Sequence, residues 1–139
     1  MITIRVDDSE VKNLLKNLQA KMRDLTPVMK IVGQTIRTSV IKNFEQGGRP
    51  VKWKPSARAS IKGDKTLIDT SRLMGSITPR AYSNKAEIGT NVIYSAIHQF
   101  GGKAGRGRKA KIPARPFLMV QEEDWKEIKE TVQGYLLKK

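Results

Sequence analysis

Apolar residues in the first third of the chain recur every three or four positions, the repeat of a helix that buries one face. One run covers residues 11–25 and a second covers residues 28–44, with Pro27 between them and Gly47 after the second. Proline suits the first turn of a helix, and glycine suits its end. We predict two N-terminal helices, either as a hairpin or as one long helix kinked at Pro27, with both apolar stripes in the core.

Later segments predict shorter elements. Alternation over residues 2–6, paired runs at 77–82 and 85–90, and an extended, proline-containing run at 112–120 indicate a small antiparallel sheet. The paired runs form a hairpin that turns at Ser83-Asn84.

Helical spacing predicts short helices at 70–77 and 92–100, a weak turn at 56–62, and a final helix beginning at Glu122. The expected fold class is therefore α+β. It has an N-terminal helical hairpin or long kinked helix, a small antiparallel sheet and a C-terminal helix. The length of 139 residues fits a single domain, 1–139.

Most of the positive charge lies in the middle of the chain. The net charge is +14, and residues 47–120 hold 15 Lys and Arg against 3 Asp and Glu. So large an excess costs self-repulsion in the compact state and suits an acidic or polyanionic partner.

Residues 101–111 concentrate this charge among glycines, so we predict a flexible basic arm there. Its candidate contacts with phosphates or an acidic surface are Lys103, Arg106, Arg108, Lys109 and Lys111. The alternative is a solvated loop that charge keeps soluble. Base-specific reading of DNA is not expected, because no recognised DNA-binding motif is present.

The chain is poorly equipped for catalysis. It has no cysteine and one histidine, His98, which excludes thiol chemistry and multi-histidine zinc sites. No apolar run is long enough for a membrane span. We predict no enzyme activity, no cofactor and no membrane partner.

Large side chains in proline-flanked segments are candidate interface residues. Trp53 lies in an extended loop and either fills the core of its own domain or anchors a neighbouring subunit. Phe117 and Arg115 lie in the proline-containing run near the C-terminus, and we group them with Trp53 as a candidate interface.

Several blocks, taken together, resemble the phage virion morphogenesis family, the tail-completion proteins of tailed phages and prophages. They are FEQGGRP at 44–50, WKP at 53–55, LIDTSRLMGSI at 67–77, YSAIHQFGG at 94–102 and IPARPFL at 112–118. One departure is Ser71, where the family usually has glycine before Arg-Leu, which puts the local turn geometry in question.

The resemblance implies a non-enzymatic structural protein that acts in tail completion or head–tail joining through protein contacts. Its expected partners are other neck or tail proteins and further copies of itself, with a ring as one form. It implies a location in the virion tail or neck, and in the host cytoplasm during assembly. The alternative from the residues alone is a non-specific nucleic-acid-binding protein, and non-specific DNA contact is compatible with both.

Overall fold

The computed structural model describes residues 2–5, 7–63, 65–68 and 71–138. The fold is α+β, with helices toward both ends of the chain and small antiparallel ribbons between them, as the sequence predicted. The elements in chain order are α1 Ser9–Arg23, α2 Thr26–Glu45, α3 Ala57–Lys62, α4 Arg72–Gly75, β1 Thr78–Ala81, β2 Ala86–Gly89, α5 Ser95–Phe100, β3 Gly102–Ala104, the 3-10 turn η1 Arg106–Arg108, β4 Ala110–Ile112 and α6 Glu122–Leu137.

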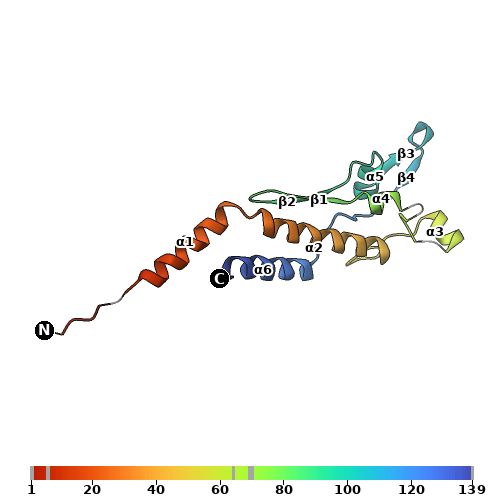
Figure 1. Ribbon diagram of the computed structural model, residues 1–139. Helices are drawn as coiled ribbons and strands as arrows, with labels where there is room; N and C mark the ends of the chain where they lie inside the picture. Colours follow the sequence, from red (N-terminus) through yellow and green to blue (C-terminus); the bar gives the residue numbers. More distant parts are fainter. Residues whose placement is uncertain (1, 6, 64, 69–70, 139) are drawn as a thin grey trace.

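Helix α2 is the centre of the molecule. The β1–β2 hairpin covers one side of it and α6 lies along the other (Figure 1). The hairpin pairs Thr78 with Gly89 and Ala81 with Ala86, which confirms the predicted turn. Two core residues of α2, Val40 and Phe44, are almost fully buried.

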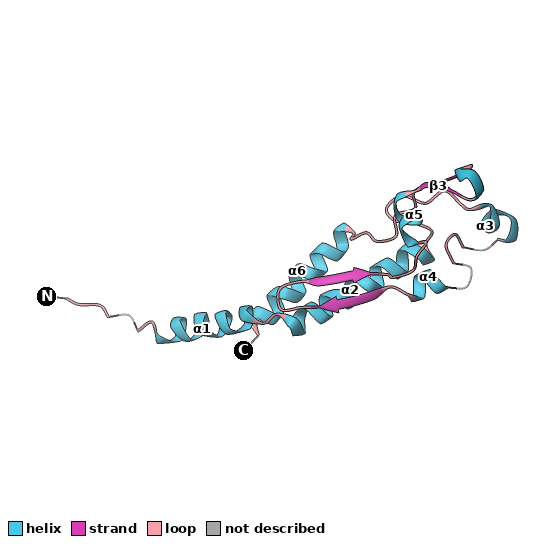
Figure 2. Cartoon of the chain, turned by 90° about the horizontal axis from the view of Figure 1, so that it is seen from above, coloured by secondary structure: helices cyan, strands magenta, loops and turns pink. Residues whose placement is uncertain are grey.

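Helix α1 turns away from this body and ends in the projecting N-terminus (Figures 1 and 2). The two N-terminal helices are thus the kinked form of the prediction, with the break at Asp24 and Leu25. The expectation that both stripes face the core is wrong for α1, which has no buried residue. Its C-terminal end meets α6, where the Lys21 Nζ donates to Tyr135 O at 3.2 Å.

The sheet differs from the prediction at both outer strands. Residues 2–5 form no strand, and Val6 lies outside the described residues. The predicted strand at 112–120 stops at Ile112, within β4, which pairs only with β3 in a separate ribbon. Beyond it, the Gln99 side chain takes the place of a neighbouring strand, since its Oε1 accepts from the backbone N–H of Phe117 and of Leu118, both at 3.0 Å.

Most of the predicted short helices form over fewer residues than expected. The segment at 92–100 becomes helical only at Ser95, because Val92 to Tyr94 form a turn in which Ser95 N donates to Val92 O at 3.1 Å. The segment at 70–77 is helical from Arg72 to Gly75, and Thr70 lies outside the described residues.

The basic arm has more regular structure than the glycine content suggested. β3 and β4 form a short antiparallel ribbon that places Gly102 opposite Ile112, closed by the η1 turn. Gly105 and Gly107 have φ of +80° and +68°, the left-handed conformation that glycine adopts without a steric penalty. Mobility of the arm stays a prediction, and we call residues 102–112 the basic hairpin from here on.

Candidate assembly interface

A buried polar network joins α2 to the start of α6. The Arg49 guanidinium donates from Nε to Asn43 Oδ1 at 2.9 Å, from Nη2 to Ser39 O at 2.7 Å and from Nη1 to Glu123 Oε1 at 2.8 Å. Asp124 completes it by accepting from the Ser39 hydroxyl and from the Gln121 backbone N–H, which caps α6. A planar guanidinium suits such a junction, because its donors point in fixed directions. The network holds the two helices at one relative position.

Trp53 packs inside the chain. Its ring lies edge-on to Phe44 with centroids 5.9 Å apart, and its Nε1 donates to Pro116 O at 3.2 Å. Gly48 permits this approach: its φ is +106°, and a Cβ there would lie 2.7 Å from the Trp53 backbone N. Trp53 is only 8% exposed, so the isolated chain offers almost none of this side chain to a neighbour.

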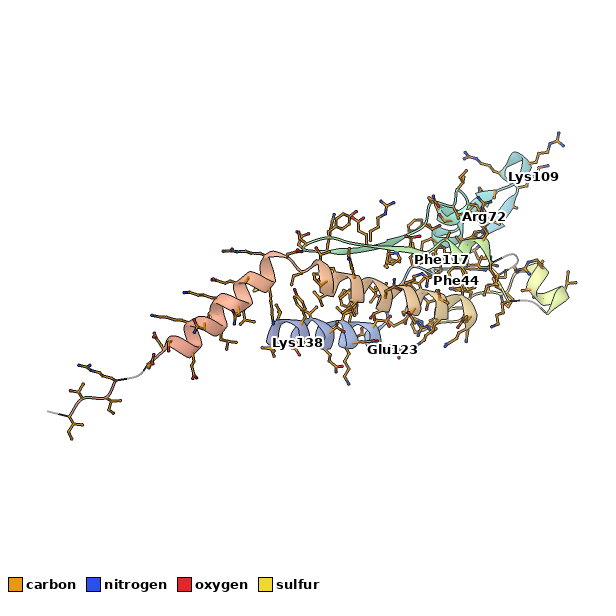
Figure 3. The ribbon with its side chains drawn as sticks, viewed as in Figure 1. Phe44, Arg72, Lys109, Phe117, Glu123 and Lys138 are labelled. Carbon is orange, nitrogen blue, oxygen red and sulfur yellow. The ribbon has the colours of Figure 1, made fainter. Side chains whose placement is uncertain are left out.

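Phe117 is also interior, with 0% exposure and a ring centroid 5.2 Å from that of Phe44 (Figure 3). Arg115, two residues earlier, is 6% exposed, and its Nε donates to Lys54 O at 2.8 Å. Its own backbone N–H donates to His98 O at 2.7 Å, which ties this segment to α5. The three predicted interface residues are therefore buried, and their contacts hold the neighbouring surface loops in place.

The basic hairpin is the opposite case. Its five predicted cations are all exposed, and Lys109 lies at the outer tip of the ribbon (Figure 3). Among the described residues, none of these cations lies within ion-pair distance of a carboxylate. The structure thus groups them on one projecting element, able to meet phosphates or an acidic protein surface. They are Lys103, Arg106, Arg108, Lys109 and Lys111.

A further surface was missed from the sequence: the apolar face of α1. Val11, Leu14, Leu15 and Met22 are between 52% and 60% exposed, although they follow the spacing of a core helix. We call these four residues, with the half-buried Leu18, the α1 stripe. No sequence signal singled it out, because its spacing is that of a helix that packs in a core.

The described residues contain no helix both long and apolar enough to cross a membrane. They also contain no group of three or more His, Cys, Asp or Glu side chains placed to hold a metal ion.

The exposed stripe and the projecting hairpin lie outside the packed core, and comparison with known proteins gives the class of protein. The model of the phage virion morphogenesis family matches residues 6–137, so the chain belongs to that family. A relative is the Mu-like prophage FluMu G protein 2 of Haemophilus influenzae, 44% identical over 136 residues, covering 97% of this chain and 96% of the relative. No solved structure matches the chain. The structural and assembly role in a phage particle is therefore established at the level of the family.

Proposed function

We propose that this protein completes the phage tail or joins head to tail, as a non-enzymatic component that forms a homo-oligomer through the α1 stripe. The observation that carries the proposal is a 15-residue helix with no buried residue and a continuous apolar face. An isolated helix of this length is marginal in water, and most helical stability in proteins comes from packing of an apolar face. The stripe therefore calls for a surface outside its own chain.

A second copy is the simplest source of that surface. Helix α1 projects from one end of the body (Figure 1), and in our proposal its stripe packs on a different surface of the neighbouring copy. Head-to-tail contacts of this kind close into rings when the rotation between copies allows it. A ring agrees with the family's role in building a tubular particle.

The three buried candidate residues stabilise a second surface, which lies away from the α1 stripe. Trp53, Phe117 and Arg115 hold the loops at the end of the body opposite α1, and the basic hairpin projects from that same end. We assign the hairpin to contact with other neck or tail proteins. The location that follows is the virion tail or neck, with the host cytoplasm as the place of assembly.

The test is the mass of the purified protein in solution. Sedimentation of the wild type is expected to show a closed oligomer, and Leu14→Ser with Leu15→Ser is expected to give a folded monomer. Ile93→Ser is the matched control, because Ile93 is 96% exposed and lies outside the stripe. A wild-type monomer at the concentration where particles assemble, or equal loss of the oligomer in the control, would contradict the proposal.

The second candidate function is non-specific nucleic-acid binding, favoured by the exposed cations of the basic hairpin. Such binding would fall steeply with salt, because counterion release supplies it. Replacing Arg106, Arg108, Lys109 and Lys111 together by Ser should abolish it without unfolding the chain. Complementation of a phage lacking this protein then separates the functions. Particles from the folded Leu14→Ser with Leu15→Ser variant, but none from the charge variant, would favour DNA binding over assembly through the α1 stripe.

A further inference from the structure

A cavity of about 230 Å³ lies near the basic hairpin, among residues of α3, α4 and α5 and the segment before Phe117. Its volume is below the roughly 300–1,000 Å³ of small-molecule and cofactor sites. The space fits a group of about the size of one amino-acid side chain.

The lining of this cavity is strongly cationic. Arg58, Arg72 and Arg115 each contribute to it from a different segment, and none of the described residues that line it is acidic. The Arg72 guanidinium lies over the Tyr94 ring at 5.8 Å from its centroid, which restricts its position (Figure 3). The remaining wall includes the apolar side chains of Leu67 and Leu73. The Arg72 and Arg115 guanidinium groups suit charge-assisted hydrogen bonds to an anionic group, and the apolar wall suits the carbon chain that carries it.

Two polar groups in the lining lack the partners that their burial calls for. Arg115 is 6% exposed, and its guanidinium makes one hydrogen bond to a described residue, the neutral Lys54 carbonyl at 2.8 Å. His98 has a buried Nδ1 with no hydrogen-bond partner among the described residues. Buried charges and polar atoms are costly unless paired, so both observations indicate a ligand that the described residues do not supply.

We propose that this cavity binds a carboxylate side chain of an adjacent polypeptide in the assembly. The ligand class follows from shape and charge together: an Asp or Glu side chain is slender enough to enter, and a planar guanidinium pairs with a carboxylate through parallel hydrogen bonds. Phosphates of a duplex lie along a broad, regular cylinder, so they meet exposed cations more readily than a buried Arg115. The inference adds a specific receptor to the proposed assembly function, on which it rests.

His98 provides a direct probe, because it is the chain's one histidine and gives a single set of ring signals in NMR spectra. The charged and titratable described residues that line the cavity with it are Arg58, Arg72, Arg115 and Tyr94, whose ring centroid lies 5.8 Å from that of His98. A bound carboxylate adds a negative charge near the ring and therefore favours the imidazolium form. Titration of the isolated protein with glutarate should shift the His98 signals saturably and raise the pKa that they report.

Substitution of Arg72 tests the site without disturbing the core, since Arg72 is an exposed residue on α4. Arg72→Gln should weaken glutarate binding about tenfold, the loss expected for one charge-assisted hydrogen bond. The matched control is Arg80→Gln, which removes the same charge from an exposed position on β1 and should leave the affinity unchanged.

Three outcomes would overturn the proposal. They are no saturable shift with glutarate, equal weakening by Arg72→Gln and Arg80→Gln, or a short DNA duplex shifting His98 at lower concentration than glutarate through Arg72. The last result would make the cavity a phosphate site. The titration uses a small dicarboxylate and the isolated chain, so it can fail while oligomerisation through the α1 stripe succeeds, and the reverse.

Discussion

Helices α1 and α2 have similar apolar periodicity and opposite surroundings. Helix α2 buries Val28, Val32, Val40 and Phe44 between the β1–β2 hairpin and α6. Helix α1 follows the same three- and four-residue spacing and buries none of its residues. Periodicity therefore predicts that a segment is a helix with one apolar face, but it does not say which molecule covers that face.

The rest of the molecule shows the same contrast, between groups that have a partner in the chain and groups that have none among the described residues. Around α2, nearly every polar group has a partner within the chain, as the Arg49 network shows. At the end that carries the basic hairpin, the cavity around Arg72 and Arg115 contains positive charge without a described counter-ion. The part around α2 satisfies its own interactions, and in our proposal a neighbour completes those of the projecting parts.

The largest expected effect comes from comparing the free energy of unfolding after substitution of a core residue and of a residue in the α1 stripe. Phe117→Ala should lower the free energy of unfolding by about 3–5 kcal/mol, because it leaves a cavity in a fully buried aromatic cluster. Leu14→Ala should change it by less than about 0.5 kcal/mol in the monomer, because half of that side chain is already in water. Chemical denaturation of both variants below the concentration of self-association measures the difference. Similar losses for the two would mean that α1 is buried in the isolated chain.

The sequence predicted the helices, the hairpin and the α+β class because these depend on local patterns. It could not predict the fate of residues 113–120, which lie beside Gln99 and Asn43 through contacts between distant segments. Hydrogen bonds with a single glutamine side chain replace a neighbouring strand there, and the spacing of residues along the chain does not predict such a contact. The interface residues show the same limit, since a large side chain beside prolines fits a core and a contact equally well.

The next test concerns the close approach between the end of α2 and Trp53. Gly48→Ala should destabilise the fold by about 2–3 kcal/mol, because φ is +106° and the added Cβ would lie 2.7 Å from the Trp53 backbone. Gly47→Ala is the matched control: its φ is +70° with no atom within 4 Å of the added Cβ, so it should cost only about 1 kcal/mol. Thermal unfolding of the two variants compares them. Equal losses would show that Trp53 does not press on Gly48.

A smaller effect is expected at the departure from the family pattern. Ser71 has φ of +62°, in the left-handed region that glycine adopts readily, so the glycine that the family resemblance leads us to expect here would suit this turn. Ser71→Gly should therefore stabilise the chain by up to about 1 kcal/mol, with the relief of backbone strain partly offset by the greater freedom of glycine when unfolded. Denaturant unfolding measures it. A loss of stability would show that the serine hydroxyl makes a contact worth more than the strain.

The smallest expected effect is a dependence of the free energy of unfolding on pH, which arises from His98 in the wall of the cavity. Burial, together with the charge of Arg115, lowers the pKa of His98 below its ordinary value of 6.5. The unfolded chain therefore binds more protons than the folded chain just below pH 6.5, so stability is full above that pH and falls as the pH drops toward the folded pKa. The change is limited because the ring is partly exposed. His98→Gln should flatten this step, and glutarate should reduce it in the wild type by favouring the charged ring. A step that persists in His98→Gln would assign it to other groups, and one that glutarate leaves unchanged would separate His98 from the proposed carboxylate site.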